Sequence, residues 1–166
     1  MEKKITVVGL GNILMQDEGA GVHAVRALEA GFELPPELVV LDGGTIGLDL
    51  LAYIENQDRA MFVDAVNFGK EPGYIGVLEN QEIPALFATK DSLHHLGLMD
   101  VLAAAQLLEV VPRETCLIGI QPLSLETGLE LSALLQGKMA LLLDRMIAQL
   151  KAWGLALTPK EIAARA

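Results

Sequence analysis

Hydrophobic and polar positions alternate along the chain in blocks that predict strands and helices in turn. Short apolar runs predict buried strands over Ile5–Val8, Leu38–Leu41, Ala60–Val63 and Leu117–Ile120. Apolar residues at helical spacing predict helices over Ala20–Leu28, Leu48–Glu55, Leu96–Leu108 and Leu129–Trp153. Tyr74–Leu78 predicts an edge strand in antiparallel pairing, because only a short segment separates it from the preceding strand.

This alternation predicts an α/β fold. We expect a three-layer sandwich with a mostly parallel, twisted sheet of about five strands and helices on both of its faces. The length of 166 residues fits one domain, and no repeat, linker or low-complexity tract divides it. The expected division is therefore a single domain over residues 1–157 and a polar tail over residues 158–166.

Charge and composition argue against several classes of partner. The chain has 12 Lys and Arg against 22 Asp and Glu, so its net charge of -10 repels nucleic acid and anionic lipid. The apolar run Ile5–Leu10 is too short to cross a bilayer, and nothing after Met1 resembles a signal peptide. We therefore expect a cytoplasmic protein with neither nucleic acid nor a membrane as its partner, and a monomer.

Two isolated residues have structural and functional interpretations. Cys116, the only cysteine, lies in the apolar run Thr115–Ile118, which favours a core thiol over a nucleophile. His23 lies among small apolar residues of the first expected helix, which favours a structural or partner-facing role.

The loop Gly9–Gly19 after the first strand contains two glycines and an acidic pair. A dinucleotide-binding fingerprint needs a third glycine where Leu14 stands, and Asp42 is further along the chain than the expected ribose-binding acid. Asp17 and Glu18 are also typical of a helix start, where the helix dipole favours negative charge. Helix-start and functional interpretations remain open for this pair.

Three further polar positions follow or flank the expected strands. In α/β sheets, ligands bind outside the carboxyl ends of the strands. Asp42-Gly43-Gly44-Thr45 follows the second strand, with Thr45 a candidate N-cap, and Asp64 ends the third strand as either a ligand or a turn residue. His94 and His95 begin a helix, on which adjacent side chains point about 100° apart, so one ion would bind only one of them.

Four of these segments, taken together, resemble the hydrogenase maturation proteases. They match that family's motifs in order and spacing: Gly9-Leu10-Gly11-Asn12-Ile13-Leu14-Met15-Gln16-Asp17-Glu18-Gly19-Ala20-Gly21-Val22, Asp42-Gly43-Gly44-Thr45, Asp64-Ala65 and Ser92-Leu93-His94-His95-Leu96-Gly97. Gly119-Ile120-Gln121-Pro122 and Ser124-Leu125-Glu126 are similar to its later strand and loop. The resemblance implies an endopeptidase that removes a C-terminal extension from the large subunit of nickel-iron hydrogenase after nickel insertion.

The resemblance also implies roles for individual residues. It implies that Glu18, Asp64 and His94 are the catalytic, metal-binding set, with Asp42 in support and His95 beside the ligand position. Two carboxylates and an imidazole suit a divalent first-row ion with open positions, so zinc and manganese also fit the ligand chemistry. The implied ion is nickel supplied by the substrate, and the implied partner is the large-subunit precursor.

Two other classes of function remain alternatives to a protease. A non-catalytic checkpoint protein would bind the nickel-loaded precursor with the same three ligands and leave cleavage to another protein. A nucleotide-binding oxidoreductase is suggested only by Gly9-Leu10-Gly11. A purely structural domain would leave the acidic pair, Asp64 and the two histidines unrelated.

Overall fold

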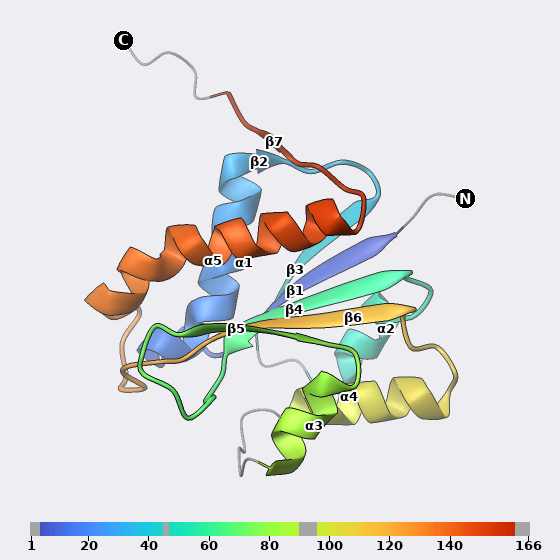
Figure 1. Ribbon diagram of the computed structural model, residues 1–166, viewed down its shortest axis with the longest axis horizontal. Helices are drawn as coiled ribbons and strands as arrows, with labels where there is room; N and C mark the ends of the chain where they lie inside the picture. The colour runs from blue at the N-terminus through green and yellow to red at the C-terminus, as the bar shows by residue number, and fades with distance from the viewer. Residues whose placement is uncertain (1–3, 45–46, 90–95, 162–166) are drawn as a thin grey trace.

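The computed structural model describes residues 4–44, 47–89 and 96–161, which form an α/β fold around a five-stranded sheet (Figure 1). Its strands, in the order in which they lie side by side, are β3 (Leu38–Gly44), β1 (Ile5–Leu10), β4 (Arg59–Ala65), β6 (Glu114–Ile120) and β5 (Ile75–Glu79). The first four are parallel, and β5 pairs antiparallel with β6 at one edge, as the sequence predicts.

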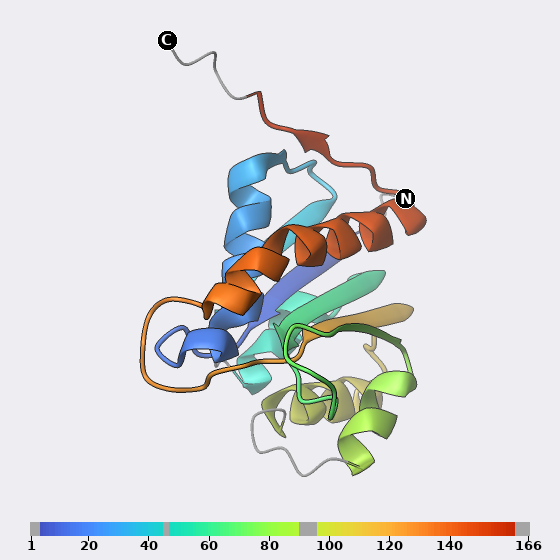
Figure 2. The same ribbon diagram turned by 60° about the vertical axis from the view of Figure 1, so that its left-hand side comes forward.

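Helices cover both faces of this sheet (Figures 1 and 2). One face carries α1 (Ala20–Gly31) and the long α5 (Ala133–Ala152), and the 3-10 turn η1 (Gln16–Gly19) leads from β1 into α1. The other face carries the short η2 (Leu48–Leu50) with α2 (Leu51–Ile54), α3 (Glu82–Thr89) and α4 (Leu96–Leu107). The predicted three-layer α/β sandwich is confirmed.

Alternate strand residues supply two separate apolar cores. Met61 and Ile118 face α1 and α5, whereas Phe62 and Leu117 face the helices of the opposite layer. All seven residues of β4 are buried, as is typical of a central parallel strand with helices on both sides. Burying an aliphatic or aromatic side chain of this size contributes about 1.5–3 kcal/mol, so the two cores hold the layers together.

The observed elements differ from the predicted ones at three places. The last helix begins at Ala133 instead of Leu129, because the Ser132 hydroxyl accepts a hydrogen bond from the Leu135 N–H and caps the helix there. Helix α3 was not predicted, although its Pro84 stands in the first turn, where proline is tolerated. The short strands β2 (Phe32–Glu33) and β7 (Thr158–Pro159) also pair antiparallel.

The order of the strands places the loops after β1 and β4 next to each other. The chain runs from β1 through α1 to β3 on one side, and then returns to β4 on the other side of β1. Ligands in open α/β sheets bind at such a switch point, outside the carboxyl ends of the strands. In residues 4–44, 47–89 and 96–161, no helix combines the length and the apolar character needed to cross a bilayer.

Candidate functional site

The loop after β1 folds into a tight turn that presents Glu18 at the carboxyl edge of the sheet. Asn12 begins the turn, because its side-chain oxygen accepts from the Leu14 N–H at 2.9 Å and its carbonyl accepts from the Met15 N–H at 3.1 Å. Gln16 then takes a positive φ of 45° and starts η1, which contains Asp17 and Glu18. Such a side-chain turn is a usual role of asparagine.

Asp17, the first acid of the pair, is fully buried and accepts four hydrogen bonds, which we call the Asp17 network. Its Oδ2 accepts from the N–H groups of Leu123 and Ser124 at 2.9 and 3.0 Å and from the Ser132 hydroxyl at 2.8 Å. Its Oδ1 accepts from the Ser132 N–H at 2.7 Å. Burial alone raises the pKa of Asp17, but hydrogen bonds from Ser124, Ser132 and Leu123 bring that pKa below its ordinary value of 3.8.

Backbone contacts extend the attachment of this loop to residues 123–132. The Gln16 N–H donates to the Gly128 carbonyl at 2.9 Å, and the Gly128 N–H donates to the Leu14 carbonyl at 2.8 Å. The Asp17 N–H donates to the Ser124 carbonyl at 3.1 Å. The segment before α5 therefore forms a wall against the loop that carries Glu18.

Gly11 is the position at which Glu18 and Asp64 come together. Its φ of 116° is one that side-chain-bearing residues rarely adopt, and a Cβ there would overlap the Glu18 carbonyl. The same Cβ would lie 3.3 Å from Asp64 Oδ1. The backbone of Glu18 and the carboxylate of Asp64 thus both border Gly11, although they come from different strand ends.

Asp64 is only 6% exposed, near the carboxyl end of β4 opposite Gly119 of β6. Its Oδ1 accepts from the Ala65 N–H at 2.8 Å. A largely buried carboxylate costs free energy unless partners or a cation compensate it. Its hydrogen bond to Ala65 shows that Asp64 shapes the turn after β4, and its role as a ligand stays a prediction.

A close approach of helix to sheet holds Glu18 over this edge. At Gly21, in the first turn of α1, a Cβ would overlap the Val63 carbonyl and lie 2.6 Å from the Leu10 carbonyl. The start of α1 therefore rests directly on β1 and β4. Only glycine permits that approach, which fixes η1 and Glu18 beside the end of β4.

Asp42 lies at the end of β3 and pairs with Arg26 of α1, with 2.9 Å between Arg26 Nη2 and Asp42 Oδ2. It lines a pocket of about 340 Å³ together with Gly44, Val22 and residues 11–14. Both side chains of the ion pair are more than a third exposed, so the pair contributes at most about 1 kcal/mol to stability. Asp42 thus flanks the loop after β1, and its supporting role stays a prediction.

The remaining predicted site residues lie outside the described residues. These are Thr45, His94 and His95, of which His94 is the expected third ligand. Among residues 4–44, 47–89 and 96–161, no three His, Cys, Asp or Glu side chains gather closely enough to hold a metal ion. The described part of the site therefore consists of Glu18 and Asp64 around Gly11.

Two residues that organise the site were not singled out by the sequence analysis. Asp17 was grouped with Glu18, yet it serves as an internal hydrogen-bond acceptor. Gln121, just after β6, accepts from the Phe68 N–H at 2.7 Å and donates to Asn67 Oδ1 at 3.2 Å, so it holds the segment that follows Asp64. The signals for Gln121 in the sequence are its place directly after an apolar strand and its place in the Gly119-Ile120-Gln121-Pro122 motif.

Cys116 and His23, the two isolated residues, both have environments typical of structural residues. Cys116 is fully buried in β6, as expected, and burial raises the pKa of its thiol to about 12. His23 is half-buried in α1, and burial, followed by the nearby Arg26, lowers its pKa. Within the described part of the chain, His23 Nε2 is buried without a hydrogen-bond partner.

Comparison with known proteins gives a consistent result. A family model for hydrogenase maturation proteases, HycI, matches residues 22–149. The hydrogenase expression/formation protein HupD of Rhizobium leguminosarum bv. viciae is 41% identical over 159 residues, which cover 95% of this chain and 79% of HupD. The hydrogenase 2 maturation protease of Escherichia coli K12 is 39% identical, with coverage of 95% and 97%.

Solved structures agree with the sequence comparison. The hydrogenase maturating endopeptidase HybD from E. coli superposes with a TM-score of 0.90 at 39% identity, over 95% of this chain and 98% of HybD. Sequence and structure therefore agree over nearly the whole chain, including both strand ends that meet at Gly11. On these grounds the chain belongs to the hydrogenase maturation protease family, whose members are endopeptidases.

Proposed function

We propose that this endopeptidase removes the C-terminal extension from the nickel-loaded large-subunit precursor of nickel-iron hydrogenase, and that Glu18, Asp64 and His94 recognise the bound nickel. The observation that carries this proposal is the meeting of Glu18 and Asp64 around Gly11. These two acids leave different strands, separated by 46 positions in the sequence, at the switch point of the sheet. Ligand sites in this class of fold lie at that place.

The donor chemistry of the proposed set fits a transition-metal ion. Carboxylate oxygens and an imidazole nitrogen suit divalent first-row ions, and three protein ligands leave coordination positions open for the substrate. When bound, such an ion polarises a carbonyl or lowers the pKa of a water molecule. Nickel belongs to the substrate in this proposal, so zinc or another divalent ion at the same residues would be a substitute for it.

The protein's own residues do the positioning. The Asp17 network fixes η1 and so the backbone of Glu18, while Gln121 fixes the segment that follows Asp64. A preorganised Asp64 carboxylate and Glu18 backbone need little rearrangement when the nickel centre arrives, which keeps the scissile bond in one place. Cleavage would then depend on nickel loading, because an empty precursor has nothing for Glu18 and Asp64 to bind.

We further infer that the chain acts as a monomer in the cytoplasm. Its net charge of -10 disfavours anionic lipid surfaces and nucleic acid, and its single cysteine is a buried core residue that fits a reducing compartment.

The experiment that tests the proposed function compares nickel-loaded and nickel-free precursor by intact-mass spectrometry. Loss of a C-terminal peptide from the loaded form alone is the expected result. Glu18→Gln, which keeps the shape but removes the charge, should abolish the mass loss, whereas the control Glu29→Gln on the exposed side of α1 should cleave at the normal rate.

Two outcomes would contradict the proposal. Cleavage of both precursors at one rate would show that nickel is not the recognition signal. Stable binding of the loaded precursor without any cleavage would instead favour the non-catalytic checkpoint protein.

A further inference from the structure

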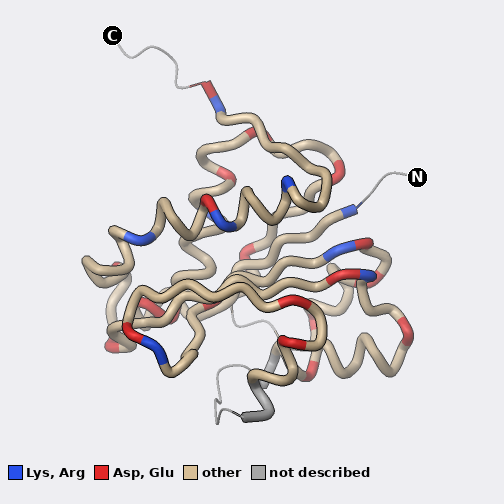
Figure 3. The backbone as a smooth tube through the Cα atoms, in the orientation of Figure 1, with Lys and Arg blue, Asp and Glu red and all other residues tan. Residues whose placement is uncertain are grey.

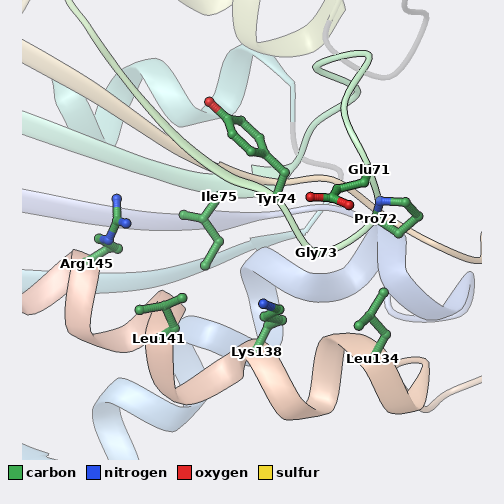
Figure 4. Close-up of a pocket in the computed structure, with 9 residues that line it drawn as sticks. All are labelled: Glu71, Pro72, Gly73, Tyr74, Ile75, Leu134, Lys138, Leu141 and Arg145. Atoms are coloured by element: carbon green, nitrogen blue, oxygen red, sulfur yellow. The ribbon is translucent and has the colours of Figure 1, made fainter.

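A groove separate from Glu18 and Asp64 runs between α5 and the segment that leads into β5. We call it the α5 groove (Figure 4). It encloses about 490 Å³ and is lined by Glu71, Pro72, Gly73, Tyr74, Ile75, Leu134, Lys138, Leu141 and Arg145. One wall is therefore a single helix face, and the other is the start of an edge strand. Its volume has room for several side chains of a second polypeptide.

On the α5 wall of the groove, apolar and cationic side chains alternate. Leu134, Lys138, Leu141 and Arg145 stand at positions i, i+4, i+7 and i+11 of α5, which places them on one face. Leu134 and Leu141 are 38% and 42% exposed, and Tyr74 on the opposite wall is 41% exposed. Three large apolar side chains in one groove favour contact with another apolar surface.

Within the described residues, the two cations of this face form no ion pair, although Glu71 lines the groove and Asp144 precedes Arg145 on α5. Among the described residues the ion pairs are Arg26–Asp42 and Arg59–Glu114, so neither Lys138 nor Arg145 has an acidic partner within 4.0 Å. Glu71 lines the groove at the Pro72 end (Figure 4), and Lys70 Nζ lies 5.9 Å from the centre of the Tyr74 ring. In a chain of net charge -10, the blue positions along α5 in Figure 3 favour an acidic partner.

The groove begins near the edge of the sheet that carries Asp64. Ile75 pairs with Ile120 at the carboxyl end of β6, and the Gly73 N–H donates to the Gln121 carbonyl at 2.8 Å. On the helix side, Leu134 follows Ser132 of the Asp17 network by two residues. The groove therefore adjoins the carboxyl end of β6, the strand that pairs with β4 beside Asp64.

We propose that the α5 groove docks an acidic segment of the large-subunit precursor that carries apolar side chains, distinct from the bond that is cut. This proposal rests on the proposed function for the identity of the partner. Carboxylates of the segment meet Lys138 and Arg145, and its apolar side chains contact Leu134, Leu141 and Tyr74. Lys138 and Arg145 attract an acidic polypeptide locally, whereas the net charge of -10 disfavours nucleic acid and anionic membrane elsewhere on the surface.

Site-directed photocrosslinking identifies the occupant. A benzophenone amino acid at Leu141 should become linked to the precursor, and mass spectrometry should place the link in a segment rich in Asp and Glu. The same probe at Leu107, which is 84% exposed on α4, serves as the control and should give no specific product. A link from Leu141 to a second copy of this chain, or no link at all, would overturn the proposal.

Charge reversal then tests the energetics of docking. Lys138→Glu with Arg145→Glu should raise the KM for the loaded precursor about tenfold and leave kcat unchanged. Lys151→Glu with Lys160→Glu changes the net charge by the same amount at exposed residues outside the groove and should leave KM unchanged. Equal KM for the groove variant and the wild type, or an equal rise in both double variants, would contradict specific docking.

The two readouts separate this proposal from the proposed function. Crosslinking at Leu141 requires no cleavage, so capture of an acidic precursor segment without a mass loss would support the groove and contradict the cleavage. Cleavage without capture, and with an unchanged KM in Lys138→Gln with Arg145→Gln, would support the proposed function and overturn the groove.

Discussion

The Ser132 hydroxyl lies 2.8 Å from Asp17 Oδ2, and it joins two parts of the chain that are 115 residues apart. The same hydroxyl accepts from the Leu135 N–H at 3.3 Å, so it caps α5 while it donates to Asp17. One side chain therefore fixes both the start of the last helix and the turn that carries Glu18. The fold and the site share this connection.

Removal of the Asp17 carboxylate should destabilise the protein. In Asp17→Ala, the N–H groups of Leu123, Ser124 and Ser132 lose their acceptor in a buried place, so we expect the free energy of unfolding to fall by about 3 kcal/mol. Urea denaturation, monitored by circular dichroism, measures this free energy of unfolding. Asp49→Ala, at an exposed position, is the control, and its free energy of unfolding should stay within about 0.5 kcal/mol of wild type. A change that small in Asp17→Ala would show that the Asp17 network does not stabilise the fold.

The stabilisation from Asp17 should depend on pH in one direction. Its folded-state pKa is lowered below 3.8, so the charged carboxylate stabilises the fold fully above the unfolded-state pKa, and this contribution is lost as pH falls through the lower folded-state pKa. The stability difference between wild type and Asp17→Asn should therefore be constant near neutral pH and shrink below about pH 4. Urea midpoints measured from pH 7 to pH 2.5 test this, and a difference that persisted unchanged to pH 2.5 would argue against it.

Substitution of Gly11 should impair both folding and cleavage. In Gly11→Ala the new Cβ overlaps the Glu18 carbonyl and crowds Asp64 Oδ1 at a φ of 116°. We expect the Glu18 backbone and the Asp64 carboxylate to shift, the fold to lose stability and the cleavage rate to fall about 100-fold. Gly137→Ala on α5 is the matched control, since its Cβ meets nothing within 4 Å. That variant should cleave normally and gain about 0.5–1 kcal/mol of stability. A normal cleavage rate in Gly11→Ala would show that the backbone at Gly11 does not position the site.

Cys116 should be chemically inert in the folded protein. Its thiol is buried in β6 and its pKa is raised to about 12, so almost no thiolate is present at pH 8. Ellman's reagent should react with Cys116 only after guanidinium is added. Rapid labelling of the native protein would show that the β6 core opens readily.

The sequence predicted the parts of the fold that depend on local patterns. Apolar runs located the five sheet strands because each is bounded by turn residues, and the shortness of the segment before β5 correctly gave its antiparallel pairing. The start of α5 was misplaced, since Leu129–Ser132 is apolar enough to continue the helical pattern. The helix starts at Ala133 because the Ser132 hydroxyl caps it, and that hydroxyl is held by Asp17, more than a hundred positions away, which no local window contains.

The roles of the candidate site residues stay predictions, although the structure locates two of these residues. Motif spacing selected Glu18 and Asp64, and the structure brings both to Gly11. The different role of Asp17 could not be derived from the sequence, because two adjacent acids look alike until the donors around each are known. His94 remains a predicted ligand outside the described residues.

The Asp17 network also has a consequence for the order of events during synthesis. A ribosome makes β1, η1 and α1 first, and the nascent chain already contains Glu18 and Asp64 long before the donors at residues 123–132 emerge. Contacts between such distant positions form late, because a long loop must close before they are gained. The loop that carries Glu18 therefore becomes ordered only after most of the polypeptide has left the ribosome, and incomplete chains that stop before Ser132 lack the two hydrogen bonds that Ser132 donates to Asp17.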